Sequence, residues 1–449
     1  MPAVPRALAL ASTLSLAALT LTPISGASAA AGAAVRASDG LVAKPAPRAT
    51  GAARARAAQA GAEDPRVGEQ WALQGDAPMG TETAWRQTTG ADVTVAVIDS
   101  GVDLGHPDLA PNLWTNPGEV PGNGIDDDGN GYVDDVHGYD FVGGDGDPQD
   151  ENGHGTHVAG IIGARGGNGI GGAGVAWRVK LMAVRVLDAD ARGTTTSVAE
   201  GIRYAVANGA RIVNLSLAGP SPTPELEDAV RFAQDHGVLV VVAAGNEGID
   251  LATAPTYPAA YGEANVLGVA ATAQDGGLSS VSDYGPGADL AAPGEQILST
   301  AIGGGYEWRT GTSMAAPAVT GALVLLAAAR PDLDAGALRD ALLGTARHTG
   351  LPVQAGALDA GAALHAVIGP DAWRAAPAAS ATTTPATRST PTKSAAKPTL
   401  SKAAAAKAKK AKAHKAAARR RARLKAARAR AARARARAAR AARAAARRA

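Results

Sequence analysis

Five runs of apolar, mostly β-branched residues recur through this 449-residue chain and constrain its fold more than any other feature. They occupy positions 93–99, 179–187, 210–217, 237–245 and 264–271. Stretches with a helical pattern, each ending at Gly, lie between some of these runs, at 197–209 and 225–237. Continuous apolar strands that alternate with helices are typical of a parallel sheet that is buried on both faces. The sequence therefore predicts an α/β fold of three layers, with a mostly parallel sheet between helices.

The globular composition begins near Asp64, and two more helices are expected toward its end. The stretch 314–331 is almost wholly apolar, which predicts a helix that crosses the interior. The stretch 332–346 is amphipathic and predicts a second helix. Further along, the sequence turns to Ala, Thr and Pro, a composition typical of linkers. We therefore expect one globular domain at 64–369 and a linker at 370–400.

The N-terminus has the pattern of a secretory signal peptide at residues 1–29. Arg6 precedes an apolar run, and the small residues at 27–29 predict cleavage after Ala29. A membrane anchor is the alternative, but the run is shorter than the roughly 20 residues of a membrane span. We therefore expect a secreted protein without a transmembrane segment. Residues 30–63 are rich in Ala, Gly and Arg without an apolar period, so we expect a disordered stretch, a short pro-segment or a linker.

Charge is divided unevenly along the chain. Residues 64–370 hold 14 Lys and Arg against 38 Asp and Glu, whereas residues 401–449 hold 20 basic residues and no acidic one. In this basic tail the Arg positions fall on every face of a helix, so no apolar stripe forms. We expect the tail to be disordered when free and to fold on an anionic polymer, which would retain the protein at the cell surface. The candidate partners are cell-wall polymers, nucleic acid, acidic lipids and the acidic domain itself; a tail that only adds solubility is the alternative.

Four polar residues stand where functional groups gather in a parallel sheet, at strand ends and before helices. Asp99 and Asn246 end two apolar strands, and His154 and Ser313 each precede a helix of small or apolar residues. A Ser hydroxyl becomes a nucleophile when a His takes its proton, and an Asp can orient that His. The Asn246 amide and the Ser313 N–H can donate hydrogen bonds to an oxyanion. The set predicts acyl transfer with Ser313 as the nucleophile.

The segments AVIDSGVD, NGHGTHVAG, AAGNEG and GTSMAAP around these residues resemble the subtilisin-like serine proteases, or subtilases, in sequence and in order. The resemblance covers about residues 64–365. It implies a sheet of about seven strands flanked by helices, and a serine endopeptidase that acts on proteins or peptides. The chain order Asp, His, Ser is the order known for the triad of this family. We expect a monomer.

The same resemblance suggests which residues bind the substrate. Ser216, Leu217 and Ala218 would run beside the substrate backbone, which would add an antiparallel strand. One wall of the pocket for the residue before the cut would be formed by Ala243, Ala244 and Gly245. Ala218 stands where the family usually has Gly.

Several other polar residues near these motifs are expected to have no role in the chemistry. His157, three residues after His154, is predicted to be structural. A group of nearby acidic residues is expected to carry ordinary surface charges: Asp103, Asp145, Asp147, Asp150 and Glu151.

The stretch GIDDDGNGYVDDVH at 124–137 begins like a calcium loop, with oxygen ligands at alternate positions and Gly131 at the sixth. Carboxylates this dense repel one another unless a cation neutralises them. The chain has no Cys, so disulfides cannot brace the loop. We expect a structural Ca²⁺ ion. Its expected ligands are Asp126, Asp128 and Asn130, the backbone carbonyl of Tyr132, and either Asp134 or Asp135.

A second loop, NGIGGAGVA at 168–176, resembles a calcium loop of the same family. Asn168 and Asp108 would contribute to this second site.

Two functions from different classes remain open at this point. The first is a secreted, calcium-stabilised serine endopeptidase with an accessory tail. The second is a polyanion-binding protein whose protease domain is secondary or inactive.

Overall fold

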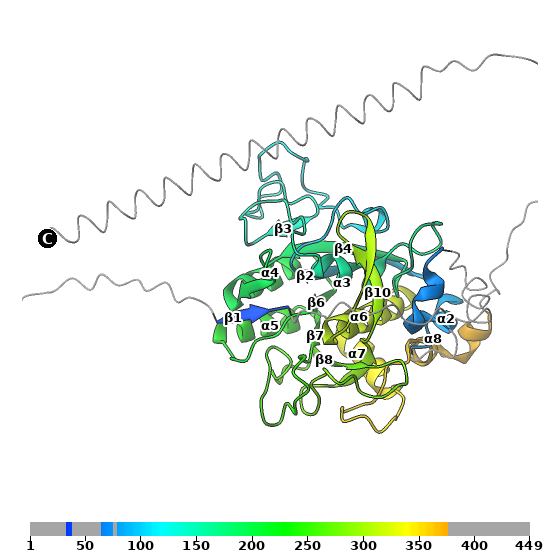
Figure 1. The fold of residues 1–449 in the computed structure, drawn as a ribbon. Coiled ribbons are helices and arrows are strands. Elements are labelled where there is room, and N and C mark those ends of the chain that lie inside the picture. The colour runs from blue at the N-terminus through cyan, green and yellow to red at the C-terminus, as the bar shows by residue number, and fades with distance from the viewer. Residues whose placement is uncertain (1–32, 38–63, 75–78, 376–449) are drawn as a thin grey trace, which may run out of the picture. The chain divides into compact units, whose positions relative to one another are not determined.

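A sheet of seven strands, each parallel to its neighbours, forms the centre of the protein (Figure 1). The structure is a computed structural model that describes residues 33–37, 64–74 and 79–375. In spatial order the strands are β3 (Gly138–Asp140), β4 (Arg178–Arg185), β2 (Gly90–Asp99), β6 (Ile212–Leu215), β7 (Leu239–Ala243), β8 (Val266–Thr272) and β9 (Leu290–Pro293). The chain adds strands on one side of β2 and then on the other, so the strand order reverses beside β2. Ligands of open α/β sheets bind at such a point, outside the carboxyl ends of the strands.

Helices cover both faces of this sheet (Figure 1). On one face lie α4 (Thr195–Ala207) and α5 (Pro224–Asp235), and on the other lie α3 (His154–Gly163) and α6 (Thr312–Ala329). Successive side chains of a strand point to opposite faces, so each inner strand contributes to both cores. In β2, Val95 and Val97 join the core with α3 and α6, whereas Ala96 and Ile98 join the core with α4 and α5. The predicted three-layer α/β fold is confirmed.

Helix α6 passes through the interior. Every residue from Thr312 to Ala327 is buried. Among the described residues, α6 is the one helix that is long and apolar enough to cross a membrane, and 89 % of it is enclosed by the protein. A helix that is apolar on all sides and enclosed in this way belongs to a core. The prediction of a core-crossing helix is therefore confirmed.

Shorter elements complete the described part of the chain. They are β1 (Ala34–Arg36) with β5 (Arg192–Thr194), the hairpin of β10 (Ile297–Ala301) and β11 (Gly305–Arg309), the helices α2 (Thr81–Trp85), α7 (Ala335–Gly344) and α8 (Ala360–Ala375), and 3-10 turns at Val67–Glu69, Trp71–Leu73 and Ala110–Asn112. Both strand pairs are antiparallel and stand outside the main sheet.

The structure differs from the sequence-based expectations in three places. The edge strands β3 and β9 were not predicted, because three and four residues are too few to show a pattern. The segment 30–63 showed no apolar period, yet Ala34–Arg36 form a strand, because the pairing partners and not the segment's own pattern define it. Helix α8 continues past a kink at Gly369, so residues 370–375, predicted as linker, are helical. The predicted signal peptide, the rest of the linker and the basic tail lie outside the described residues.

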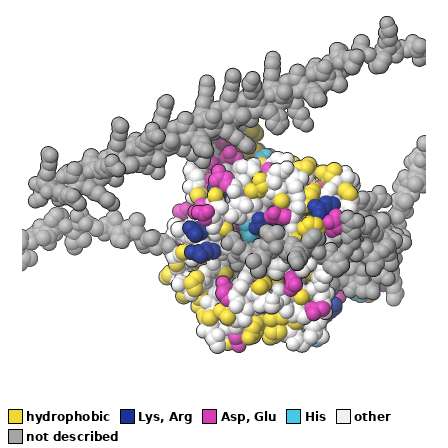
Figure 2. All heavy atoms as spheres, viewed as in Figure 1, with side chains coloured by type: hydrophobic (Ala, Val, Ile, Leu, Met, Phe, Trp, Pro, Cys, Tyr) yellow, Lys and Arg dark blue, Asp and Glu magenta, His cyan; other side chains and the backbone are white. Residues whose placement is uncertain are grey.

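The surface of the described part carries dispersed charges. Figure 2 shows Asp and Glu side chains at several separate places on one face, with a few Lys and Arg between them. On this face the acidic excess of residues 64–370 is thus distributed and does not form a single patch.

Candidate active site

The four residues expected to carry catalysis lie on neighbouring elements. Asp99 is the last residue of β2, and Asn246 follows the end of β7 by three residues. Strand β6 lies between these two strands, so both residues stand at the same edge of the sheet. His154 is the first residue of α3 and Ser313 is the second residue of α6.

Asp99 and His154 form a buried pair. His154 Nδ1 lies 2.8 Å from Asp99 Oδ1, and both side chains are fully buried. The backbone N–H of Ser100 also donates to Asp99 Oδ1, at 2.7 Å. Because the carboxylate holds the proton at Nδ1, Nε2 is the basic nitrogen of the neutral imidazole. His154 Nε2 is buried and has no hydrogen-bond partner among the described residues.

Ser313 is held beside the end of β6. Its Oγ donates to the carbonyl oxygen of Ser216 at 3.3 Å, and Ser216 Oγ donates to the carbonyl oxygen of Ser313 at 2.9 Å. Gly311 precedes the helix with a φ of 151°, and a Cβ atom at this position would lie 2.9 Å from the Asn246 amide nitrogen. The absence of a side chain at Gly311 therefore lets Asn246 approach the start of α6.

The amide of Asn246 has a defined orientation. Its Oδ1 accepts hydrogen bonds from the Thr312 backbone N–H at 2.7 Å and from Thr312 Oγ1 at 3.0 Å. A backbone N–H can only donate, so the amide oxygen and not the nitrogen faces Thr312. Asn246 Nδ2 is left buried, without a hydrogen-bond partner in the described part of the chain. A buried, unpaired donor near the start of α6 is suited to bind an oxyanion.

The segment expected to bind the substrate backbone follows β6 directly. Ser216 and Leu217 are fully buried, whereas Ala218 is partly exposed. Ala218 lines a groove of about 750 Å³, together with Gly245 and Asn246. The predicted backbone-binding segment thus borders both Ser313 and this groove.

Only one residue of the predicted pocket wall lines the groove. Gly245 lines it, but Ala243 and Ala244 are fully buried and do not. Ala244 contributes to the wall of the groove indirectly. Its carbonyl oxygen accepts a 2.6 Å hydrogen bond from Oγ1 of Thr256, and Thr256 lines the groove.

The prediction of a surface charge is wrong for Asp150, which is buried. Its carboxylate accepts five hydrogen bonds, from the hydroxyls of Ser100 and Thr156 and from the backbone N–H groups of Asn152, Gly153 and Thr156. A buried carboxylate is stable where such donors compensate for lost water. Asp150 therefore ties the turn after Asp99 to the start of α3. The local sequence does not reveal this role, because part of the donor set lies 50 residues away.

The surface-charge prediction is also wrong for Asp103. Its carboxylate is largely buried and accepts hydrogen bonds from the backbone of Gly105 and Gly303 and from the side chain of Gln149. Asp147 and Glu151 are exposed, as expected.

Two further titratable groups border the site. Burial lowers the pKa of His157 to about 3, and its Nε2 lies 3.1 Å from the Glu307 carbonyl oxygen, so this imidazole is neutral. Burial raises the pKa of Asp283 to about 6, and the neighbouring carboxylate of Glu247 adds to the rise. Asp283 Oδ1 accepts the backbone N–H of Glu247 at 3.0 Å, and Glu247 Oε2 accepts that of Asn246 at 3.0 Å. Asp283 thus supports the loop that carries Asn246, which the sequence patterns did not reveal.

Comparisons with known proteins identify relatives of this chain. The sequence model of the subtilase family matches residues 90–367 of this chain. The chain is 44 % identical to thermitase of Thermoactinomyces vulgaris over 244 residues, which cover 54 % of this chain and 78 % of thermitase. It is 43 % identical to subtilisin BL of Lederbergia lenta over 265 residues, 59 % of this chain and 87 % of that protein. A solved protease from Pseudoalteromonas arctica is 31 % identical with a TM-score of 0.58, and the match covers 68 % of this chain and 99 % of that one.

The chain belongs to the subtilase family. Subtilases are serine endopeptidases, and this chain is therefore a hydrolase of peptide bonds. The matched region 90–367 contains Asp99, His154, Asn246 and Ser313.

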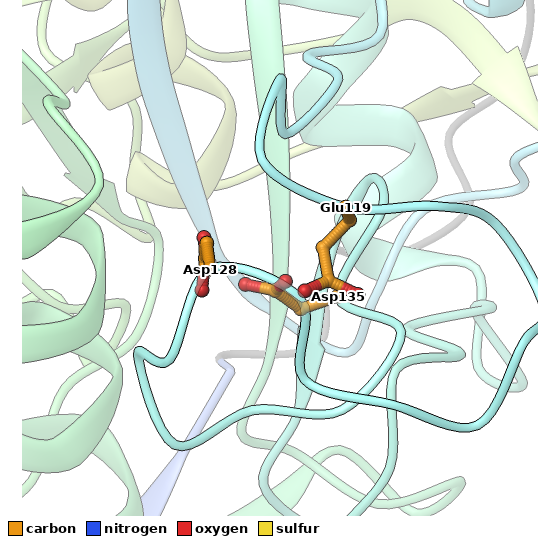
Figure 3. Close-up of side chains that lie close together, drawn as sticks. All are labelled: Glu119, Asp128 and Asp135. Atoms are coloured by element: carbon orange, nitrogen blue, oxygen red, sulfur yellow. The ribbon is translucent and has the colours of Figure 1, made fainter.

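Three carboxylates of this subtilase gather in the insertion that precedes His154 (Figure 3). Oxygens of Glu119, Asp128 and Asp135 lie within 4.8 Å of one another. Asn116 Nδ2 donates to both Asp128 and Asp135, at 2.9 Å each. Glu119 Oε2 is buried and has no hydrogen-bond partner among the residues described. Convergent carboxylates with an unpaired buried oxygen match the oxygen ligands that Ca²⁺ prefers.

The other expected calcium ligands lie differently. The Asp126 carboxylate accepts the backbone N–H groups of residues 129–131, and the Asp134 carboxylate accepts those of residues 122–124. These two residues brace turns of the loop. The side-chain N–H groups of Asn130 donate hydrogen bonds to the carboxylates of Asp128 and Asp135. Glu119 was missed because it lies before the stretch that resembles a calcium loop.

An aromatic cluster attaches the insertion to helix α4. The ring of Tyr132 lies 4.7 Å from that of Tyr139, 5.8 Å from that of Phe141 and 4.8 Å from that of Tyr204, measured between centroids. Tyr204, on α4, donates its hydroxyl to Asp135 Oδ2 at 2.6 Å. Burial raises the pKa of Tyr204, so its hydroxyl stays a donor. The carboxylate cluster is therefore connected to the rigid core.

The residues expected at the second calcium site are in direct contact. Asn168 Nδ2 donates to Asp108 Oδ1 at 2.6 Å, and the hydroxyl of Tyr306 donates to Asp108 Oδ2 at 2.7 Å. Burial raises the pKa of Asp108. Both oxygens of this carboxylate thus accept hydrogen bonds from side chains, and a second metal position here stays a prediction.

Replacing Asp150 by Asn is expected to lower both stability and activity. In the variant side chain, the amide nitrogen would face either the backbone N–H of Thr156 or that of Gly153. Both of these groups are donors, so a buried N–H would be left without an acceptor, at a cost of about 1–3 kcal/mol. Urea unfolding in a Ser313→Ala background, which prevents self-digestion, measures this cost. In the active enzyme, kcat for a small peptide should fall about tenfold because His154 is less firmly positioned. Asp147→Asn removes the same charge from an exposed site and should change neither quantity; equal stability of the two variants would contradict a structural role for Asp150.

Proposed function

We propose that this subtilase cuts extended segments of proteins and peptides, with Ser313 as the nucleophile, His154 as the general base and Asp99 as the residue that orients His154. One observation carries most of the proposal. The buried contact of 2.8 Å between Asp99 and His154 occupies Nδ1 and leaves Nε2 without a partner among the described residues. An imidazole held in this way is prepared to take a proton.

The proposed reaction follows from these contacts. Ser313 Oγ attacks the substrate carbonyl carbon while His154 Nε2 takes the hydroxyl proton. Asp99 stabilises the resulting imidazolium, which then donates the proton to the leaving amine. Water, activated by the same imidazole, hydrolyses the acyl-enzyme and restores the Ser313 hydroxyl. The oxyanion would accept hydrogen bonds from Asn246 Nδ2 and from the Ser313 backbone N–H. The segment from Ser216 to Ala218 would pair with the substrate backbone.

Substitutions at Ser313 and Asn246 test this assignment. Ser313→Ala should reduce kcat for a neutral peptide by at least about 10³-fold, because no other group can form the acyl-enzyme. Asn246→Ala should reduce kcat by about 100-fold, as for the amide donor of subtilisin, with KM nearly unchanged because the donor acts on the transition state. Asn208→Ala at the end of α4 is the matched control. A Ser313→Ala enzyme that retains its kcat would exclude Ser313 as the nucleophile.

The proposal includes export through residues 1–29 and attachment to an anionic polymer through the basic tail at 401–449. Support comes from the sequence alone: the pattern of the signal peptide, and 20 basic residues without an acidic one. The alternative function, a polyanion-binding protein with an inactive protease domain, depends on the same tail. The orientation of the buried catalytic groups favours the endopeptidase.

We further propose that Glu119, Asp128 and Asp135 hold a structural Ca²⁺ ion. The buried and unpaired Glu119 Oε2 supports the proposal, because an uncompensated carboxylate oxygen is costly unless a cation or a donor meets it. The ion would neutralise the three carboxylates and link the insertion to α4 through Asp135 and Tyr204. It would take no part in the reaction.

Calcium removal should therefore lower the melting temperature, because a ligand bound to the folded state alone stabilises it by mass action. Melting curves of the Ser313→Ala protein, recorded with chelator and with rising Ca²⁺ concentration, measure the effect. Glu119→Gln should shift the calcium dependence at least tenfold toward higher concentration, whereas Asp147→Asn, with the same change of charge, should not. Identical curves with chelator and with excess Ca²⁺ would exclude a structural calcium ion.

A further inference from the structure

The loop that carries Asn246 is held by one buried residue, Asp283. Asp283 is fully buried and lies in the connection between β8 and β9. Its Oδ1 accepts the backbone N–H groups of Glu247 and Ile249, at 3.0 Å each. Its own backbone N–H donates to the carbonyl oxygen of Gly245 at 3.0 Å. Hydrogen bonds to a single residue thus fix the chain both before and after Asn246.

The second oxygen of the Asp283 carboxylate meets no donor. Asp283 Oδ2 is buried and has no hydrogen-bond partner in the described part of the chain. A Cβ atom at Gly245 would lie 2.0 Å from this oxygen and 3.3 Å from Glu247 Oε2. The two carboxylate oxygens therefore converge on the space that Gly245 leaves open. A buried carboxylate oxygen is costly unless a donor meets it, so this arrangement needs a physical reason.

Glu247 connects this pair of carboxylates to Asn246 itself. Glu247 Oε2 accepts the backbone N–H of Asn246 at 3.0 Å. Glu247 is exposed and lines the groove beside Asn246, so its side chain is free to turn into water. Such a turn would leave the Asn246 N–H without its acceptor. The position of Asn246 therefore depends on what holds Glu247 Oε2 beside Asp283.

The surroundings offer no basic side chain for this task. Among the described residues, neither Asp283 nor Glu247 forms an ion pair. The neighbouring segments contribute Asp250 and Tyr284, which form a parallel bridge, and α6 contributes the hydroxyl of Thr312. Burial, together with the charge of Glu247, raises the pKa of Asp283 to about 6. A proton is thus the one positive charge that these residues can place between the two oxygens.

We propose that Asp283 and Glu247 share a proton, and that this hydrogen bond makes Asp283 a positioning residue for Asn246. The proposal rests on the function proposed above, in which Asn246 binds the oxyanion. The protonated Oδ2 of Asp283 donates to Glu247 Oε2 and holds Glu247 against the loop. When the proton is lost, two like charges face each other beside a buried site, and Glu247 turns into water.

The shared proton and His154 affect catalysis in opposite directions as the pH changes. His154 acts as a base only when it is neutral, so its contribution to kcat increases with pH. Loss of the shared proton loosens the oxyanion donor and lowers kcat. KM changes little, because the donor acts on the transition state. A ratio of kcat values between two variants cancels the titration of His154, because both variants contain it.

Asp283→Asn tests the shared proton. The amide oxygen still accepts the two backbone N–H groups, and the amide nitrogen gives Glu247 a donor that does not titrate. For a small neutral peptide, kcat of this variant relative to the native enzyme should be close to one at about pH 5 and should rise about threefold or more by about pH 8, with KM nearly unchanged. Asp275→Asn removes the same charge from an exposed turn between β8 and β9, and its ratio should stay constant.

Melting temperatures provide a second readout. The pKa of Asp283 is about 6 in the folded protein, against an ordinary value of 3.8. The folded state therefore binds the proton more tightly than the unfolded state, and stability is lost as the pH rises between these two values. In a Ser313→Ala background, the melting temperature of Asp283→Asn should increase relative to its parent over this range and keep its advantage above it.

Glu247→Gln provides a third readout at an exposed position, where the substitution leaves the core unchanged. It removes the second charge, so its kcat ratio to the native enzyme should also rise between about pH 5 and about pH 8. This variant decides the question if Asp283→Asn does not fold. Ratios that stay constant or fall with pH would overturn the shared proton while the oxyanion assignment stands. An Asn246→Ala enzyme with unchanged kcat would overturn that assignment and this proposal together.

Discussion

Two carboxylates, those of Asp99 and Asp150, lie buried in one continuous set of hydrogen bonds at the end of β2. Charges removed from water are costly unless donors compensate for the lost water, and each missing donor costs on the order of 1–3 kcal/mol. At Asp99 the donors meet Oδ1, whereas Oδ2 is buried without a hydrogen-bond partner among the described residues. The donors here come from Ser100, from His154 and from the first turn of α3. Folding therefore fixes the turn after β2 and the start of α3 relative to each other. The imidazole is oriented before any substrate arrives.

The order of the strands supplies the rest of the site. Strand β6 stands between β2 and β7, so the segment that begins at Ser216 lies between Asp99 and Asn246. Helix α6 is almost wholly apolar and buried against the sheet, which fixes the position of its first turn. Two hydrogen bonds between Ser216 and Ser313, and two from Thr312 to Asn246, attach that turn to the strand ends. Donors that are fixed in advance need not reorganise during the reaction, which is the main source of their effect.

The sequence predicts those parts of the protein that a local pattern defines. The inner strands are continuous apolar runs, α6 is an almost wholly apolar stretch of helical length, and the proposed catalytic residues stand in motifs of six to nine residues. The features that were missed depend on partners distant in sequence. Asp150 was expected at the surface because its donor Ser100 lies 50 residues away. Glu119 joins carboxylates that a search for one contiguous loop does not include, and β1 is a strand only because β5 and Ala218 pair with it.

A crystal structure of the enzyme with a peptide boronic acid would test the catalytic assignment most directly, because the boronate imitates the tetrahedral intermediate. We expect a covalent bond between boron and Ser313 Oγ. One boronate oxygen should lie within hydrogen-bond distance of Asn246 Nδ2 and of the Ser313 backbone N–H, and the other should face His154 Nε2. A boronate bonded to a different side chain, or one whose oxygens make no contact with Asn246 Nδ2 and His154 Nε2, would contradict the assignment.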